Sequence, residues 1–378
     1  PAFFALMPIR KPALSLRLSS SDDEDVTELS DGLAAVSVQR RQGSFSLSET
    51  MTFDSEDIRL RGAKGMELHG GDSASSVTLR DLERLKQLGA GATSRVFLVR
   101  HKTTGQSFAL KELTVMADRD TRHMAVNELR LAHKSSQGEH LIRFVDAFFD
   151  EGKILIAMEF ADCGSLDDAI QRGQGGVPGV PETETGLMVL QALQGLLYLH
   201  REMKQMHRDL KPANVLLTRG GLVKLSDFGI SKQLEATDSL AVTQCGTIQY
   251  MSPERLLGDE YSFESDVWSM GVIVLEALHG RLPYPNACSF MAQMHMVTKG
   301  DAPATPDGCS AEVRQVAAHC LRKELAGPEP RPSVPELLRM PWLSAFAADG
   351  SHEHRCQRIA AFLDGQLGGV GVELEEGK

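Results

Sequence analysis

The stretch of sequence that decides the fold is HRDLKPAN at residues 207–214, followed by DFG at residues 227–229. Phosphoryl transfer needs a carboxylate that orients the attacking hydroxyl and accepts its proton, and Asp209 can do this. It also needs hard oxygen ligands for Mg²⁺, which Asn214 and Asp227 can supply. Lys211 can reach the transferred phosphate from the same loop. A solvated polar loop would hardly produce this order and spacing by accident.

A glycine-rich turn lies upstream of this motif. Its two glycines allow a tight strand-turn-strand whose N–H groups can approach phosphates closely. Taken alone, the turn is more typical of an ordinary hairpin than of a phosphate-binding loop. A strand follows it, which excludes a dinucleotide fingerprint, and no Gly-Lys-Ser/Thr ends it, which excludes a P-loop. The candidate phosphate-binding residues are Gly89, Ala90, Gly91, Ala92, Thr93 and Ser94.

A lysine and a glutamate complete the candidate phosphate clamp. Lys111 ends the strand-like run FALK, and Glu128 follows on a helical stretch. A lysine on a strand or a glutamate on a helix is usually exposed to solvent. Both follow a phosphate-sized glycine turn, however, where Lys111 could bind the α- and β-phosphates and Glu128 could fix its position.

Together these motifs resemble the catalytic domain of eukaryotic protein kinases over residues 79–343. MSPE at 251–254 stands where the family has Ala-Pro-Glu, and DVWSMG at 266–271 is similar to the helix that braces the catalytic loop. The resemblance implies that Arg331 pairs with Glu254. The glycine loop departs from the family pattern at its third glycine, where Ser94 stands.

The resemblance also implies ATP and Mg²⁺ as cofactors and a bilobal fold with adenine between the lobes. The adenine site it implies has Val96 and Ala109 above the ring, Leu216 below it, Met158 at the back wall, and the backbone of Glu159 to Ala161 as the hinge. These assignments follow from matching the family motif, since an apolar residue at such a position is more often plain core.

The fold class expected is α+β, with a small strand-rich N-terminal lobe and a larger helical C-terminal lobe. Five short strand-like runs occur from about residue 79 to residue 160, interrupted by one helical stretch, and helical patterns dominate from there to about residue 343. Residues 1–78 are rich in Ser, Asp, Glu and Gly and are expected to be mostly disordered. Residues 344–378 are expected to form one more helix and a polar tail.

The catalytic and activation loops indicate which kind of kinase this is. Lys211 is typical of serine/threonine-type catalytic loops, and the segment up to YMSPER at 250–255 is similar to MAP kinase kinases. Thr237 and Thr243 have five residues between them, which resembles the plant and algal spacing of the two regulatory phosphorylation sites. The resemblance thus implies a dual-specificity kinase that an upstream MAP kinase kinase kinase activates. Ser231 and Ser239 lie close to the two threonines and are alternative candidates for phosphorylation.

A short N-terminal pattern agrees with this interpretation. Arg10 and Lys11 precede Leu14 and Leu16 within residues 10–18. This resembles the docking peptide with which MAP kinase kinases hold their MAP kinase substrate, the basic residues meeting an acidic patch and the leucines entering a groove. A basic disordered tail is the alternative.

Composition limits the partners and the compartment. The formal net charge of −11 argues against nonspecific nucleic-acid or membrane-surface binding. Six cysteines without a C-x-x-C pair favour free thiols. No apolar run approaches the length of a membrane span, and no secretory signal is visible. The expected location is the cytosol or the nucleus.

Two alternative functions remain open from the sequence. One is another serine/threonine kinase of the same group that acts on proteins other than MAP kinases. The other is a pseudokinase that acts as a scaffold, which the presence of Lys111, Asp209 and Asp227 disfavours.

Overall fold

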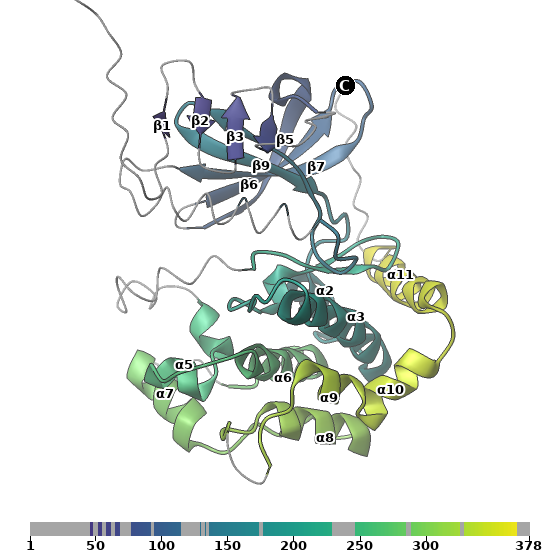
Figure 1. Ribbon diagram of the computed structural model, residues 1–378. Coiled ribbons are helices and arrows are strands. Elements are labelled where there is room, and N and C mark those ends of the chain that lie inside the picture. Colours follow the sequence, from purple (N-terminus) through teal and green to yellow (C-terminus); the bar gives the residue numbers. More distant parts are fainter. Residues whose placement is uncertain are drawn as a thin grey trace, which may run out of the picture. The chain divides into compact units, whose positions relative to one another are not determined.

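The computed structural model describes a discontinuous set of residues, all within one compact unit spanning residues 43–378. The described residues are 46–47, 52–54, 58–61, 65–68, 77–91, 94–114, 129, 133, 136–173, 177–228, 246–284, 289–325 and 329–368. Most strands precede most helices along the chain, and the two kinds of element are segregated (Figure 1).

The main sheet has five antiparallel strands in the order β5-β6-β7-β9-β8. The five strand-like runs of the sequence and the expected α+β class are thereby confirmed. Its strands are β5 (Leu82–Ala90), β6 (Ser94–His101), β7 (Ser107–Thr114), β8 (Phe144–Asp150) and β9 (Lys153–Glu159), after the 3-10 helix η2 (Leu79–Asp81).

Tight turns join the neighbouring strands. Between β8 and β9, Glu151 and Gly152 both have positive φ, 46° and 74°, as a two-residue type I′ hairpin requires. Between β5 and β6, the N–H of Gly91 donates to the carbonyl of Ser94 at 2.8 Å, which closes the glycine turn.

The two faces of the sheet differ. Alternate residues of β6 to β9, among them Val99, Phe108, Leu110 and Phe148, are buried in one apolar cluster. Because side chains alternate along a strand, the intervening residues point to the opposite face. That opposite face carries Lys111.

The C-terminal part of the chain is mainly helical. Its elements are α2 (Leu166–Arg172), α3 (Glu182–Arg201), η3 (Pro212–Asn214), β10 (Val215–Leu217), β11 (Val223–Leu225), η6 (Gly246–Tyr250), α5 (Pro253–Leu257), α6 (Glu264–His279), α7 (Phe290–Lys299), α8 (Ala311–Cys320), α9 (Val334–Leu338), α10 (Pro341–Ala348) and α11 (His352–Gly368). Helix α11 lies within residues 344–378, where the sequence predicts one more helix.

Helices α3 and α6 form the centre of this helical region. Both are buried along most of their length, as expected for helices that are apolar on all sides. Glycines allow close packing: a Cβ at Gly186 would lie 2.1 Å from Phe346 of α10, and one at Gly271 would lie 2.5 Å from the Cβ of Cys320. The core therefore fixes the elements that carry the loop at 207–214.

A small four-stranded sheet precedes the main one. It contains β1 (Ser46–Leu47), β2 (Thr52–Asp54), β3 (Ile58–Arg61) and β4 (Met66–Leu68), paired in that order and antiparallel. The sequence did not indicate these strands, because segments of two to four residues are too short for an alternating pattern to be recognised. Gly65, Val77 and Thr78 are also described, and Val77 is buried in the apolar cluster of the main sheet. The other residues of 1–78, for which mostly disorder is expected, lie outside the described set.

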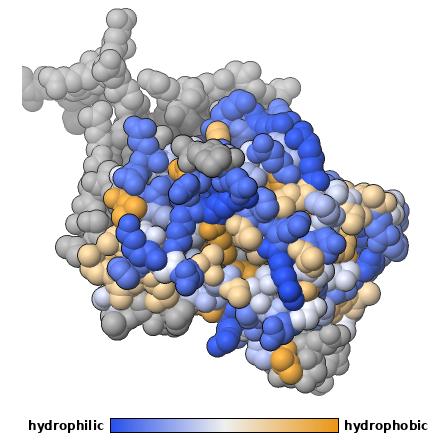
Figure 2. All heavy atoms as spheres, turned by 90° about the horizontal axis from the view of Figure 1, so that it is seen from below, coloured by the Kyte–Doolittle hydropathy of each residue, from blue (hydrophilic) through white to orange (hydrophobic). Residues whose placement is uncertain are grey.

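The hydrophilic surface and the free cysteines agree with what the composition predicts. Hydrophilic residues are spread over the face drawn in Figure 2, and strongly hydrophobic residues form small separate groups. The four described cysteines, Cys163, Cys309, Cys320 and Cys356, are free thiols. Among the described helices, none is long and apolar enough to cross a membrane.

Candidate active site

The loop between α3 and β10 brings three of the predicted residues together. The Lys211 Nζ lies 3.0 Å from Asp209 Oδ2. Asn214 donates from Nδ2 to the same Oδ2 at 3.0 Å and to the Asp209 carbonyl at 2.7 Å. The Asp209 side chain is still 25% exposed, so it is held in place and remains accessible to a substrate hydroxyl.

Asp266 of α6 fixes the backbone of this loop. Its carboxylate accepts hydrogen bonds from the N–H groups of His207 at 2.8 Å and Arg208 at 3.0 Å, and it contacts His200 Nε2 at 2.8 Å. Burial of Asp266 opposes its ionisation, but the hydrogen bonds from His200 and the N–H of Arg208 and the charge of the two histidines together keep the pKa of Asp266 below its ordinary value. Arg208 has a φ of 70°, which costs energy for a non-glycine residue. The carboxylate thus stabilises a strained backbone just before Asp209.

Lys111 and Asp227 meet although they are distant in the sequence. The Lys111 Nζ lies 2.6 Å from Asp227 Oδ1. The ammonium group lowers the pKa of Asp227, although burial opposes this. Asp227 has a φ of 58°, a second strained position. Because the N–H of Ser226 donates to the carbonyl of Asn214 at 3.0 Å, the chain segments that carry Asp227 and Asn214 are neighbours.

These residues offer the ligands that Mg²⁺ prefers. The carboxylate of Asp227 and the side-chain amide of Asn214 are hard oxygen donors on adjacent segments. Since Asn214 turns its Nδ2 toward Asp209, its Oδ1 is the atom left for a cation. The donor chemistry therefore fits a magnesium ion.

Strand register places the predicted adenine-contacting residues on the face of the sheet that carries Lys111. Val96 is paired with Lys111, and Ala109, two residues before Lys111, is paired with Met158. Directly opposed residues share a face, as do residues two apart. All three apolar side chains are partly exposed, in contrast to Phe108 and its buried neighbours on the other face.

The last residue of β9, Glu159, belongs to the predicted hinge. Glu159 accepts a hydrogen bond from the N–H of Arg143 at 2.7 Å and pairs with Lys224 Nζ at 2.8 Å. The sequence analysis assigned only the backbone of Glu159, so this ion pair was not foreseen. Leu216, assigned below the adenine ring, is partly exposed and is joined to Ser165 by an isolated β-bridge.

The glycine turn leaves space beside it. A Cβ at Gly89 would meet no heavy atom within 4 Å, and one at Gly91 would come no closer than 3.5 Å, to Ser94 Oγ. Packing within the described chain therefore does not demand glycine at either position. Close approach of a ligand to the backbone is a sufficient reason for both.

Several predicted residues lie outside the described residues. They are Ala92 and Thr93 of the glycine turn, Glu128, the phosphorylation sites Thr237 and Thr243, and the docking residues Arg10, Lys11, Leu14 and Leu16. Their assignments stay predictions.

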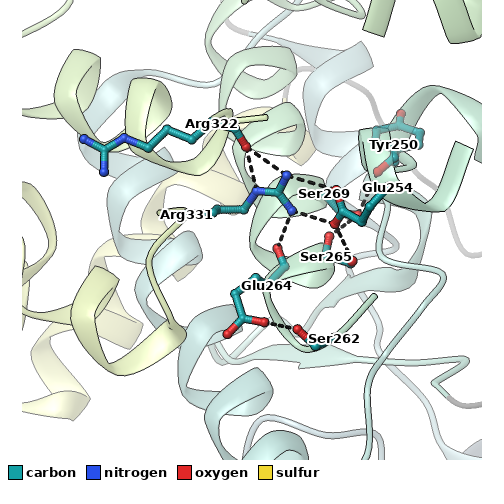
Figure 3. Close-up of polar contacts among 8 residues, drawn as sticks. All are labelled: Tyr250, Glu254, Ser262, Glu264, Ser265, Ser269, Arg322 and Arg331. Carbon is teal, nitrogen blue, oxygen red and sulfur yellow. Dashed lines mark hydrogen bonds and ion pairs between the residues drawn. The ribbon is translucent and has the colours of Figure 1, made fainter. Parts of the chain in front are cut away.

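The expected pairing of Glu254 with Arg331 is confirmed (Figure 3). Two guanidinium nitrogens of Arg331 bind the two carboxylate oxygens of Glu254 at 2.8 and 3.1 Å. Ser265 Oγ donates to the same carboxylate at 2.6 Å. The guanidinium also donates to the carbonyls of Arg322 and Glu264. This network ties the segment after the activation loop to α6 and to the chain before α9.

Two further contacts near this segment were missed by the sequence analysis. Arg255 Nη1 donates to the carbonyl of Arg208 at 2.6 Å, so it also supports the strained residue before Asp209. Tyr250 donates to the buried carboxylate of Glu276 at 2.7 Å. No local pattern could have indicated either pair, because the partners are far apart in the sequence.

This arrangement matches the comparisons with known proteins. A protein kinase domain model matches residues 82–343, and the chain therefore belongs to the protein kinase family. Members of that family use ATP and Mg²⁺.

Within the protein kinases, the chain belongs with the MAP kinase kinases. It is 38% identical to mitogen-activated protein kinase kinase 2 of Arabidopsis thaliana over 72% of this chain and 75% of that protein. It is 33% identical to mitogen-activated protein kinase kinase 1c of Physcomitrium patens over 84% of this chain and 95% of that protein. It is also 43% identical to dual specificity mitogen-activated protein kinase kinase 1 of Dictyostelium discoideum, over 56% of this chain and 32% of that protein.

Proposed function

We propose that this chain is a dual-specificity MAP kinase kinase, which transfers the γ-phosphoryl group of ATP to a threonine and a tyrosine of a MAP kinase activation loop. The observation that carries the proposal is the set of contacts that holds an accessible Asp209 between Lys211 and Asn214. Identity to MAP kinase kinases over most of the chain supports the choice of substrate. The four free cysteines are consistent with a location in the cytosol or the nucleus.

Each residue has a distinct task in this reaction. Asp209 orients the substrate hydroxyl and accepts its proton as the oxygen attacks the γ-phosphorus. Lys211, beside Asp209, stabilises the negative charge on the transferred group. Asn214 and Asp227 hold Mg²⁺, which when bound neutralises charge on the phosphate oxygens.

The face of the main sheet that carries Lys111 takes the nucleotide. Lys111 binds the α- and β-phosphates, and Glu128 positions it. The apolar side chains of Val96, Ala109, Met158 and Leu216 sandwich the adenine, and the backbone from Glu159 to Ala161 supplies hydrogen bonds to its edge. The partial exposure of the four apolar side chains supports this assignment.

The test uses a MAP kinase whose own catalytic lysine has been replaced, so that all phosphate transferred comes from this chain. We expect phosphate on both the threonine and the tyrosine of its Thr-x-Tyr loop. Lys111→Met should lower kcat at least about 100-fold because the transition state loses charge stabilisation. The control is Lys86→Met, since Lys86 is an exposed lysine of β5 in the same sheet. Phosphate on only one residue type would refute dual specificity, and near-normal activity of Lys111→Met would refute the clamp.

We further propose that phosphorylation of Thr237 and Thr243 by a MAP kinase kinase kinase switches the enzyme on. Arg208 supports this, because its buried Nε and Nη1 atoms have no hydrogen-bond partner among the described residues. A phosphothreonine brings a charge of about −1.5 to −2 and three acceptor oxygens to such a guanidinium. The double variant Thr237→Ala/Thr243→Ala should remain at the basal rate after treatment with the upstream kinase. Full activation with phosphate on Ser231 or Ser239 instead would rule this out.

The N-terminal residues Arg10, Lys11, Leu14 and Leu16 are proposed to tether the MAP kinase. A tether raises the effective concentration of substrate without taking part in chemistry. Replacing the four residues with Ala should raise KM for the whole MAP kinase about tenfold or more and leave activity on a short peptide substrate unchanged. Equal loss on both substrates would argue against docking.

A further inference from the structure

A group of metal-ligating side chains lies outside the candidate active site. One ligand atom from each of Glu139, His140 and His352 lies within 4.8 Å of the others, and this is the one such group of three found among the described residues. Glu139 and His140 lie in the loop that precedes β8, and His352 is the first residue of α11. The loop and the helix are thus brought together by the fold.

The separations suit a small tetrahedral ion. His140 Nε2 lies 3.7 Å from one carboxylate oxygen of Glu139, and His352 Nε2 lies 3.5 Å from the other. Zinc binds nitrogen and oxygen ligands at about 2.0–2.1 Å in a tetrahedron, so its ligand atoms lie about 3.3–3.4 Å apart. Because Glu139 is exposed, its side chain can turn one oxygen toward the ligand nitrogens of both histidines, which lie within 4.8 Å of each other.

The tautomer of His140 is set by its second nitrogen. Its Nδ1 lies 3.0 Å from the carbonyl oxygen of Val223. A carbonyl only accepts hydrogen bonds, so Nδ1 carries the proton and Nε2 keeps a free lone pair directed at Glu139 and not at the backbone. This pattern, with one imidazole nitrogen on the metal and the other donating to a backbone carbonyl, is common for metal-binding histidines.

A sulfur ligand is close to the group. Cys356 lies four residues after His352 on α11, so both side chains are on one face of the helix. Its Sγ is 3.4 Å from His352 Nε2, but it does not lie within 4.8 Å of the ligand atoms of all three residues. Gln191 Nε2 lies 3.6 Å from the same sulfur, which helps to fix its position.

We propose that Glu139, His140 and His352 bind a zinc ion. Cys356 joins the coordination as a thiolate when its side chain turns toward the ion, releasing its proton to solvent as the metal binds. Two imidazoles and a thiol exclude Mg²⁺ and Ca²⁺, which take oxygen ligands, and they favour zinc among common divalent ions. Other first-row metals that fit the same ligands would be distinguished by comparing their affinities for the protein with that of zinc.

Such an ion would fasten α11 to a loop that leads to the active site. The loop pairs with β11, since the N–H of Leu225 donates to the carbonyl of His140 and the N–H of Ile142 donates to the carbonyl of Leu225, both at 2.9 Å. Leu225 stands two residues before Asp227. The metal ion would therefore stabilise the segment that positions Asp227, and it would take no part in catalysis.

The test measures zinc binding to the full chain without an affinity tag, after removal of metal with a chelator. Titration against a chromophoric zinc chelator should show one tight site per chain. Glu139→Gln and His352→Ala should each weaken binding at least about 100-fold, since removing a ligand costs more than the 10- to 100-fold lost with a supporting group. His354→Ala is the matched control, because His354 is an exposed histidine two residues away on α11. Its affinity should change less than twofold.

Two further readouts do not depend on kinase activity. Zinc should raise the Tm of the wild-type protein and of His354→Ala but not that of His352→Ala, whose circular dichroism reports whether it has folded. Co²⁺ should give a thiolate charge-transfer band that Cys356→Ser abolishes. Absence of saturable zinc binding in the wild-type protein, or equal affinity in Glu139→Gln and wild type, would overturn the site. A charge-transfer band that survives in Cys356→Ser would remove Cys356 from it.

Discussion

Replacing Glu254 with alanine tests how strongly the buried ion pair with Arg331 stabilises the helical region. The Arg331 side chain is 0% exposed and that of Glu254 is 7% exposed. The substitution removes two charge-assisted hydrogen bonds from Arg331 and one from Ser265. At about 1.5–3 kcal/mol each these would sum to roughly 4.5–9 kcal/mol. The carboxylate, however, no longer has to be desolvated, and breaking a buried pair typically costs about 3–5 kcal/mol.

We therefore expect Glu254→Ala to lower the free energy of unfolding by about 3–5 kcal/mol. The variant Glu254→Gln keeps the shape and can still accept from Ser265, so about 2 kcal/mol is expected for the lost charge. A second replacement, Arg331→Met, added to Glu254→Ala should cost less than it does alone, because the cation is then no longer buried without a partner.

The assay is unfolding in urea followed by tryptophan fluorescence. Both tryptophans, Trp268 and Trp342, are buried in the helical region, and the guanidinium of Arg331 lies 5.1 Å from the Trp268 ring. The control is Glu260→Ala, since Glu260 is exposed and should change stability by less than about 0.5 kcal/mol. A loss below about 1 kcal/mol for Glu254→Ala would refute the reasoning, because the ion pair would then be no stronger than a surface pair.

The pair also sets a pH dependence. Burial opposes ionisation of Glu254, but the hydrogen bonds and charge of Arg331, together with the hydrogen bond from Ser265, keep the pKa of Glu254 below its ordinary value of 4.5. The folded state therefore binds fewer protons than the unfolded state near this pH. The stabilisation is fully present above about 4.5 and is lost as the pH falls through the lower pKa of the folded state. Glu254→Gln should flatten this part of the stability profile in acid.

Three further outcomes are expected. Asp266→Asn should lower kcat by roughly 10- to 100-fold with little change in the KM for ATP, because the loop before the catalytic carboxylate loses its brace; steady-state kinetics measure both. Burial raises the pKa of Glu276 to about 7, so the folded state holds an extra proton between pH 4.5 and 7 and loses stability as the pH rises. The stability advantage of Glu276→Gln over the wild type should accordingly grow by up to about 3 kcal/mol from pH 5 to pH 8. Gly221→Ala should lower the free energy of unfolding by more than about 2 kcal/mol, measured by denaturant unfolding. Gly221 has a φ of 78°, and a Cβ there would lie 1.9 Å from the Cys356 carbonyl oxygen. Gly220→Ala should change the free energy of unfolding little.

Much of this molecule could be predicted from sequence where the signal is local. The five strands of the main sheet have alternating apolar residues between Gly-containing turns, so both their existence and their order along the chain were correct. Asp209, Lys211 and Asn214 lie within six residues, and one loop therefore brings them together. The short strands at 46–68 carried no such signal.

What could not be predicted depends on tertiary packing. The ion pair of Glu159 with Lys224 and the group formed by Glu139, His140 and His352 join segments far apart in the chain. A histidine or glutamate in isolation is usually a solvated residue. Only the folded backbone, which brings the first turn of α11 beside the loop before β8, shows that these side chains meet.

The two strained residues next to the catalytic groups connect stability with function. Arg208 and Asp227 both have φ values of about 60–70°, a conformation that costs of order 1–3 kcal/mol for non-glycine residues. Each is held by a charged partner: Asp266 binds the N–H of Arg208, and Lys111 binds the side chain of Asp227. The two supports differ in kind, because Asp266 is buried in α6 and permanent, whereas Lys111 is the residue proposed to bind phosphates. Nucleotide binding would therefore compete for the partner of Asp227 while leaving Arg208 fixed, so the segment of Asp227, which is proposed to bind magnesium, is the part of the site expected to adjust when ATP enters.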